Sequence, residues 1–139
     1  MLFRSLLILD EPINGLDIPS KNIFRKLLTF CSSDDRIVII STHQARELEN
    51  LINAIIFLDS GEIIFNKTVQ EINNKILFKK LNINEETLYS EISASGKIGV
   101  VENSDETESP ISLELLFNMT IKNKELVKSL FNESIKRKS

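Results

Sequence analysis

The sequence is almost without the residues that build disulfide-rich domains and soft-metal sites. Its 139 residues include one cysteine, Cys31, and one histidine, His43. A single cysteine excludes an internal disulfide framework and any metal site built from several cysteines. A single histidine likewise excludes a cage of several histidines. We therefore expect a protein of a reducing, cytoplasmic setting.

Long apolar runs and a basic charge balance are also missing. No apolar run approaches the ~20 residues of a membrane-spanning helix, and the first residues do not resemble a secretion signal. Any contact with a membrane is therefore expected to run through a partner. The formal charge of −3 disfavours nucleic acid as a partner, because phosphate binding requires a concentrated basic face.

Glycine is scarce, and none of the four glycines lies in a phosphate-binding loop. Such a loop needs a glycine five residues before a Gly-Lys pair and a hydroxyl residue directly after it. Around the Gly-Lys pair at Gly96 and Lys97, these positions hold Glu91 and Ile98. The pair is therefore interpreted as a turn.

The most informative segment is residues 6–12, which read Leu-Leu-Ile-Leu-Asp-Glu-Pro. A run this short and this apolar predicts a strand buried on both faces of a parallel sheet, and such strands present their ligands at the carboxyl end. Asp10 and Glu11 occupy that end. In a nucleotide hydrolase the first acid can hold Mg²⁺ through water, and the second can orient the attacking water.

Three further segments follow in a familiar order. Asn14-Gly15-Leu16-Asp17 comes after the acids, Ser41-Thr42-His43 after the next apolar strand, and residues 58–64 have the pattern of a hairpin. With this order and spacing the chain resembles the ATP-binding (ATPase) subunit of ABC transporters, in its Walker B strand, D-loop and H-loop. The resemblance covers residues 5–66 and departs at Ile13, where the family has a small or hydroxylated residue.

The resemblance implies a set of site residues and the cofactors ATP and Mg²⁺. Glu11 would be the catalytic base, and His43 would be the catalytic sensor of the terminal phosphate. Asp10 would hold Mg²⁺ through water. Asp17, which would report across a dimer, and Gln44 would also contribute to cofactor binding. For Gln44, a polar residue at the start of a helix is an equally good interpretation.

The resemblance also implies partners for an intact subunit. It would work as a dimer with a second ATPase subunit, bound to a membrane permease at the cytoplasmic side of the membrane, with a lean toward export. The Ser-Gly-Gly signature loop is missing here, as is the phosphate loop. We expect Met1 to begin in the middle of a domain, through truncation, a split gene or a misplaced start. The chain alone is expected to be inactive.

The predicted fold class is α/β, with two parts. Residues 1–66 are expected to be the C-terminal half of a nucleotide-binding domain, a partial P-loop NTPase sheet that ends in an antiparallel hairpin. Residues 67–139 are expected to be a small α+β accessory extension. Strands are predicted at 5–9, 36–41, 54–59, 62–66, 76–81, 88–93 and 97–102, and helices at 19–31, 44–51, 69–74, 113–120 and 126–131.

Two alternatives remain open. The chain could be a non-catalytic interaction module that pairs with a separate chain carrying the phosphate loop. In either case, the chain alone is expected to expose an apolar patch and a sheet edge, because its apolar strands lack neighbours. A chromosome-maintenance or DNA-repair ATPase shares some motifs. The predicted hairpin, the missing coiled coil and the acidic charge disfavour that class.

Overall fold

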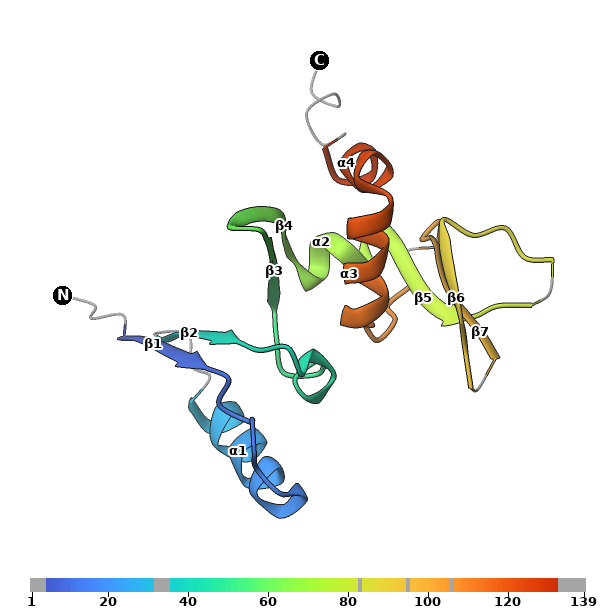
Figure 1. The fold of residues 1–139 in the computed structure, drawn as a ribbon. Helices are drawn as coiled ribbons and strands as arrows, with labels where there is room; N and C mark the ends of the chain where they lie inside the picture. The colour runs from blue at the N-terminus through green and yellow to red at the C-terminus, as the bar shows by residue number, and fades with distance from the viewer. Residues whose placement is uncertain (1–4, 32–35, 83, 95, 106, 133–139) are drawn as a thin grey trace. The chain divides into compact units, whose positions relative to one another are not determined.

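The computed structural model describes residues 5–31, 36–82, 84–94, 96–105 and 107–132. The chain forms two compact units, residues 1–51 and residues 52–139. In Figure 1 the first unit runs from blue to teal and the second from green to red. The boundary at Asn66, which was placed where the recognisable motifs stop, stays a prediction about motif content.

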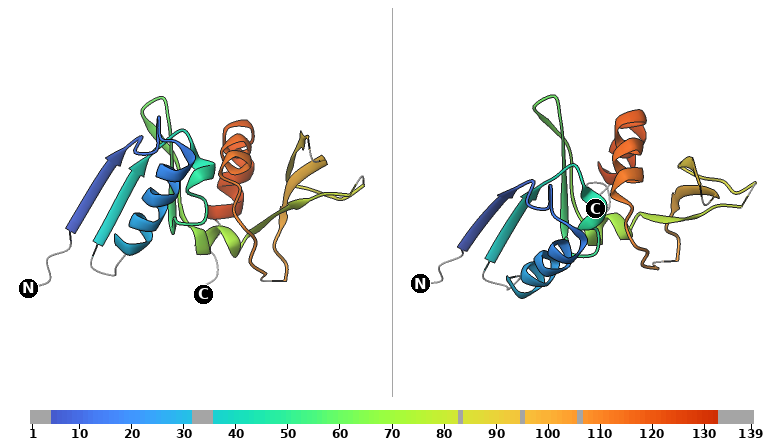
Figure 2. Two further views of the ribbon diagram at one scale, coloured as in Figure 1. Left: turned by 90° about the horizontal axis from the view of Figure 1, so that it is seen from below. Right: turned by 60° about the horizontal axis from the view of Figure 1, so that its bottom comes forward.

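The first unit is built on two parallel strands. Strand β1 (Ser5–Asp10) pairs with β2 (Arg36–Ser41), and the register places Asp10 opposite Ser41. Helix α1 (Ile18–Cys31) connects them and runs alongside the pair (Figures 1 and 2). This confirms the predicted strand-helix-strand order with parallel pairing. The predicted helix stop at residues 32–35 lies outside the described residues.

The two strands are not buried on both faces, as the sequence predicted. Leu6 and Ile8 of β1 are 59% and 66% exposed, and Ile37 of β2 is also exposed. The physical reason is that α1 is the one α-helix described in the first unit, so at most one face of the two strands has a helix against it. The exposed apolar patch expected for the chain alone is confirmed.

Helix α1 likewise covers less than its pattern predicts. Its apolar residues recur at three- and four-residue steps, yet of these Leu28 is buried, whereas Ile23 is exposed and Leu27 is 57% exposed. The helix starts at Ile18, one residue before the predicted start at Pro19. A small sheet cannot cover the whole apolar stripe of a helix with four turns.

The helix predicted at residues 44–51 is replaced by a short 3₁₀ turn, η1 (Ala45–Glu47). Its bonds span three residues: the Glu47 amide donates to the Gln44 carbonyl at 3.2 Å, and the Leu48 amide to the Ala45 carbonyl at 3.0 Å. The Gln44 side chain makes no cap hydrogen bond. Without a cap and with one anchored apolar residue, buried Leu48, the segment does not extend into an α-helix.

The second unit begins with a hairpin of β3 (Ala54–Asp59) and β4 (Glu62–Thr68). Ser60 and Gly61 have φ of 52° and 83°, as a two-residue hairpin turn requires. The sequence predicts this hairpin as the end of the first sheet, but among the described residues it forms a sheet of its own. Helix α2 (Val69–Asn73) follows, with a Thr68–Glu71 capping box.

A three-stranded antiparallel sheet follows in the order β5-β7-β6. Its strands are β5 (Ile76–Lys80), β6 (Tyr89–Ser93) and β7 (Gly96–Glu102). Helices α3 (Leu113–Lys122) and α4 (Lys124–Asn132) complete the unit, with the predicted break at Asn123. Phe57 and Phe65 pair across the hairpin. Two further aromatic pairs link the hairpin to the helices: Phe57 with Phe117 of α3, and Phe65 with Phe131 of α4.

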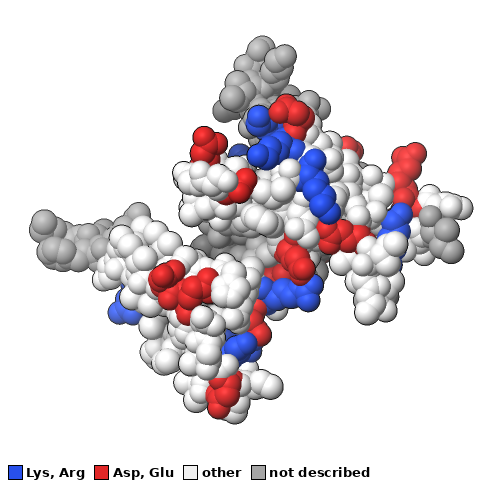
Figure 3. All heavy atoms as spheres, viewed as in Figure 1, with Lys and Arg blue, Asp and Glu red and all other residues white. Residues whose placement is uncertain are grey.

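Figure 3 shows charged side chains of both signs on one face of the structure. On the face drawn in Figure 3, Lys and Arg side chains are interspersed with Asp and Glu. A continuous basic surface does not form on that face among the described residues.

Candidate functional site

The site lies where strands β1 and β2 end. Because the strands are parallel, their carboxyl ends meet at one edge, and Asp10, Glu11, Thr42 and His43 come together there. The Glu11 amide donates to the Ser41 carbonyl at 2.8 Å, which continues the ladder past the end of β1. Glu11 has a φ of 44°, a left-handed conformation that a non-glycine residue adopts rarely and mostly where the surroundings require it.

Glu11 accepts hydrogen bonds from both residues that follow β2. Its Oε1 accepts the His43 backbone N–H at 2.9 Å and lies 2.7 Å from the imidazole Nδ1. Its Oε2 accepts the Thr42 hydroxyl at 3.1 Å. The structure therefore brings together Glu11 and His43, which are 32 residues apart in the sequence.

These bonds keep Glu11 ionised. The pKa of Glu11 lies below its ordinary value, first because of the hydrogen bond with the His43 side chain, with further lowering by the Thr42 hydroxyl and the His43 amide. A carboxylate offers about four lone-pair positions. With two contacts at Oε1 and one at Oε2, the open position is on Oε2, where a water molecule can donate.

The contact also sets the proton arrangement of His43. For Nδ1 to bond a carboxylate it must carry a proton, and the remaining nitrogen, Nε2, then donates only if the ring is doubly protonated. The side chain of His43 is 68% exposed, so Nε2 is open to an incoming group. A charged imidazolium would bond Glu11 on one side and an anion on the other.

Asp10 is held by its partner across the ladder. The Ser41 hydroxyl donates to Asp10 Oδ1, which leaves Oδ2 open. Among the described residues no cluster of three or more His, Cys, Asp or Glu side chains could hold a metal ion. One carboxylate and one hydroxyl suit Mg²⁺, which prefers oxygen ligands and keeps several waters. The residues therefore fit an ion contacted through water.

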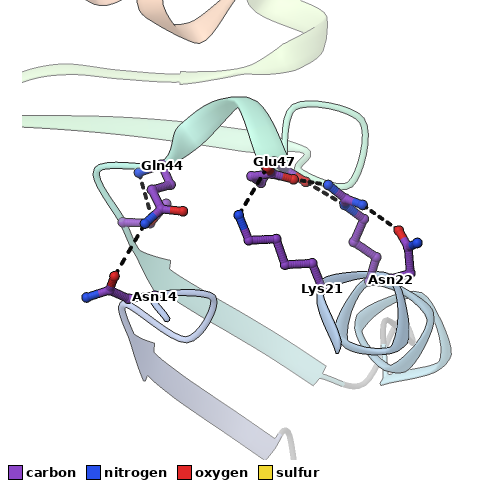
Figure 4. Close-up of polar contacts among 7 residues, drawn as sticks. Asn14, Lys21, Asn22, Gln44 and Glu47 are labelled. Carbon is purple, nitrogen blue, oxygen red and sulfur yellow. Dashed lines mark hydrogen bonds and ion pairs between the residues drawn. The ribbon is translucent and has the colours of Figure 1, made fainter. Parts of the chain in front are cut away.

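Asp17 and Gln44 make structural contacts near this edge. Asp17 is the N-cap of α1: its Oδ1 accepts the Ser20 amide at 2.9 Å. The pKa of Asp17 is lowered, first by the Ser20 side chain and then by that amide. The Gln44 amide donates to Thr42 Oγ1 at 2.9 Å, and Gln44 Nε2 donates to Asn14 Oδ1 at 3.4 Å (Figure 4).

Sequence reasoning did not assign roles to Ser41 and Thr42, although both lie within the motif that ends at His43. Each supplies a hydroxyl to one of the two acids. The signal was the position of a Ser-Thr pair at the end of a strand that lies beside the acidic one. Parallel pairing places such hydroxyls opposite the acids.

Comparison with known proteins supports the resemblance. The chain is 30% identical to the ABC transporter ATP-binding protein NatA of Bacillus subtilis over 77 residues, 55% of this chain and 31% of that protein. It is 39% identical to the Lantibiotic transport ATP-binding protein SrtF of Streptococcus pyogenes over 82 residues, 54% of this chain and 36% of that protein.

A longer match extends into both compact units. The Uncharacterized ABC transporter ATP-binding protein MJ1023 of Methanocaldococcus jannaschii is 23% identical over 114 residues, 82% of this chain and 43% of that protein. The chain is a relative of the ABC transporter ATP-binding proteins. Its mixed α/β structure agrees with the P-loop NTPase fold that this homology implies.

The ABC relationship concerns part of a longer architecture. The matched segments make up 31% to 43% of these relatives, so the chain spans less than half of their length. No protein-family model matches the chain, and no solved structure matches it significantly. In this ABC relative, none of the helices among the described residues is both long and apolar enough to cross a membrane.

Proposed function

We propose that this ABC relative supplies the half of an ATP-hydrolysis site that handles the attacking water. The observation that carries the proposal is the bonding of Glu11 to Thr42 and His43 at the ends of two adjacent parallel strands. This arrangement fixes a carboxylate with one open lone pair beside an exposed imidazole. ATP binding as the general role is supported by the homology.

Glu11 orients the water that attacks the terminal phosphate and accepts its proton at Oε2. Because its pKa is lowered, Glu11 is a weak base, and its contribution comes mainly from orientation and electrostatics. Such effects dominate phosphoryl transfer, in which charge develops on the phosphoryl oxygens. The Thr42 hydroxyl keeps the carboxylate turned toward the water.

His43 and Asp10 act beside this carboxylate. His43, held at Nδ1 by Glu11, would contact the terminal phosphate through its exposed ring edge at Nε2. Asp10, held by Ser41, would contact Mg²⁺ through the water shell of the ion. When bound, Mg²⁺ neutralises charge on the phosphate oxygens.

The whole-protein properties are part of the proposal. An intact subunit would dimerise, with Asp17 reporting across the dimer and Gln44 beside the bound nucleotide. It would bind a membrane permease at the cytoplasmic side of the membrane, and the transporter would export its substrate. The 139 residues hold no phosphate loop, so we propose that the chain alone neither binds nor hydrolyses ATP.

The first test is a thermal unfolding series of the chain with ATP and Mg²⁺. A ligand that binds the folded state raises the melting temperature, so we expect no rise with millimolar nucleotide. A clear upward shift would overturn the half-site proposal.

The second test asks whether the half-site works when completed. The matched 82-residue segment of the Streptococcus pyogenes protein is replaced by the corresponding residues of this chain, and ATP hydrolysis is measured. We expect hydrolysis that falls by at least about 100-fold in Glu11→Gln, with a strong loss also in His43→Ala. Glu62→Gln, in the hairpin, is the control with an unchanged rate. Undiminished hydrolysis in Glu11→Gln would remove Glu11 from the base role.

The exposed strand faces favour a second candidate, a module that pairs with a separate chain carrying the phosphate loop. Leu6, Ile8 and Ile39 present apolar surface that such a chain could cover. Co-purification with a phosphate-loop protein would favour pairing. If the complex hydrolysed ATP equally well with Glu11→Gln, the chain would be a non-catalytic module.

A further inference from the structure

A cluster of charged and polar side chains joins α1 to the turn η1 (Figure 4). Lys21 Nζ donates to Glu47 Oε1 at 3.3 Å, and Arg25 Nη2 donates to Glu47 Oε2. Arg25 Nη1 also donates to Asn22 Oδ1 at 2.8 Å. Lys21 and Arg25 lie one turn apart on the same face of α1, so both reach the same carboxylate.

Arg25 makes the contact that distinguishes this cluster from an ordinary surface ion pair. Its Nε donates to the backbone carbonyl of Glu47 at 3.0 Å, while Nη2 contacts the carboxylate of the same residue. The planar guanidinium therefore fixes the backbone of η1 as well as a side chain. An exposed ion pair contributes little, but these side chains are partly covered and share several hydrogen bonds.

The chain connects both sides of the cluster to the candidate site, through α1 to Glu11 and through η1 to His43. Asp17 caps α1 one turn before Lys21, and the chain from Glu11 to Asp17 is a tight turn, with the Asn14 amide bonded to the Glu11 carbonyl at 3.1 Å. On the other side, Glu47 lies four residues after His43. The 3₁₀ bond from the Glu47 amide to the Gln44 carbonyl shortens that connection.

We propose that Lys21, Arg25 and Glu47 form a clamp that positions His43 against Glu11. The clamp rests on the proposed function of the Glu11–His43 pair. Its members are positioning residues, because they contact neither Glu11 nor His43. The short turn between Gln44 and Glu47 has no α-helical ladder to stiffen it, so the ends of the segment must be held from outside. Gln44 bonds Thr42 and Asn14 at one end, and the clamp holds the other.

The test uses the full chain labelled with ¹⁵N. Its first measurement is hydrogen exchange of the His43 backbone amide, which donates to Glu11. The second is the ¹⁵N chemical shift of His43 Nδ1, which is unambiguous because the chain has one histidine. Glu11→Ala supplies the reference shift of the unbonded imidazole.

Arg25→Gln is expected to raise exchange of the His43 amide by about tenfold, with little change at the ladder amides of β1 and β2. The Nδ1 shift should move toward that of Glu11→Ala. Lys26→Gln is the matched control: it removes the same charge from the adjacent, exposed residue and should leave both readouts unchanged. Arg25→Lys should recover only part, because an ammonium cannot bond carboxylate and carbonyl with fixed fork geometry.

Two results would overturn the clamp. Arg25→Gln could match Lys26→Gln in both readouts, or it could raise exchange equally over the whole first unit, which would make Arg25 a general support of the fold. If Arg25→Gln does not fold, Glu47→Gln takes its place, since it keeps the backbone carbonyl that Arg25 contacts. Both readouts need no ATP, so failure of the clamp is distinct from failure of hydrolysis in the chimera.

Discussion

The two compact units hold their structure by different means. The first has three buried apolar residues among those described and many exposed ones, whereas the second buries a larger set, drawn from its hairpin, its three-stranded sheet and its helices. The buried apolar residues are Ile13, Leu28 and Leu48 in the first unit, and Ile55, Phe65, Ile72, Ile76, Val100, Ile111, Leu113, Leu115, Leu116, Met119, Val127 and Phe131 in the second.

The candidate site residues all lie in the first unit, which has the smaller core. Their geometry depends on local hydrogen bonds: Ser41 to Asp10, Thr42 and His43 to Glu11, and Ser20 to Asp17. Strand pairing brings the partners together, and the polar contacts orient them. The comparison teaches that a recognisable site can keep its arrangement where apolar burial is slight.

The largest expected effect tests the difference in burial. Leu116 in α3 is fully buried and Leu27 in α1 is 57% exposed, so the same change to alanine should act very differently. Leu116→Ala should lower the free energy of unfolding by about 2–5 kcal/mol, and Leu27→Ala by less than about 0.5 kcal/mol. Urea unfolding followed by residue-resolved NMR measures each unit separately. Equal losses would break the comparison.

The burial difference is also where sequence reasoning failed. The apolar run at 6–9 predicts a strand correctly, but the prediction of burial on both faces assumes neighbouring layers that the pattern of one strand cannot supply. The segment at 44–51 contains helix-forming residues, yet Gln44 provides no cap and Glu47 is drawn to Arg25 of α1. Contacts between segments, which a local pattern cannot contain, decide both cases.

The site was predictable to the extent that its residues are adjacent in the sequence. Asp10 and Glu11 end one strand and Thr42 and His43 follow another, so parallel pairing alone brings them together. The clamp was not predictable, because Lys21, Arg25 and Glu47 are ordinary charged residues on exposed segments. Only their distances in the folded chain show the shared carboxylate.

A second prediction concerns close packing in the three-stranded sheet. A Cβ at Gly99 of β7 would lie 2.3 Å from Leu81 Cδ1 and 2.8 Å from the Tyr89 carbonyl oxygen. Gly99→Ala should therefore lower the free energy of unfolding by about 1–3 kcal/mol, because the backbone oxygen cannot move cheaply. Gly15→Ala is the comparison in the first unit, where open space surrounds the Cβ and only the φ of 75° is strained. A larger loss at Gly15 would contradict this account.

A third prediction places the two units on equal terms. Asp17 is the N-cap of α1 in the first unit, and Glu71 completes the capping box of α2 in the second, where Thr68 is the N-cap. The pKa of each acid is lowered by hydrogen bonds, from Ser20 and Thr68 respectively. A lowered folded-state pKa gives stability that is present above the unfolded-state pKa and is lost as the pH falls through the folded-state value. Unfolding measured between pH 7 and pH 2 should show this loss in both units.

Substitution with the neutral amides identifies the groups responsible. Asp17→Asn and Glu71→Gln keep a side-chain oxygen as acceptor but cannot titrate. In each variant, the free energy of unfolding of the unit that carries the substitution should therefore fall less between pH 7 and pH 2, and that of the other unit should be unaffected. If Asp17→Asn leaves the pH dependence of the first unit's stability unchanged, the acid sensitivity of that unit belongs to other carboxylates, Glu11 among them.

The smallest expected effect compares two strained backbone positions, one in the candidate site and one in a hairpin turn. Each unit has one described non-glycine residue with positive φ, Glu11 at 44° and Ser60 at 52°. Asparagine tolerates this conformation better than either. Ser60→Asn creates the Asn-Gly pair favoured in two-residue hairpins and should stabilise the second unit by about 0.5 kcal/mol.

Glu11→Asn relieves the same conformation but shortens the side chain that reaches Thr42 and His43, so we expect no gain in unfolding experiments. A gain at Glu11 equal to that at Ser60 would mean that the Thr42 and His43 contacts do not hold the left-handed backbone. If Glu11→Asn gives no gain although asparagine suits this conformation better, the backbone of Glu11 is held in the left-handed conformation by the contacts of its carboxylate.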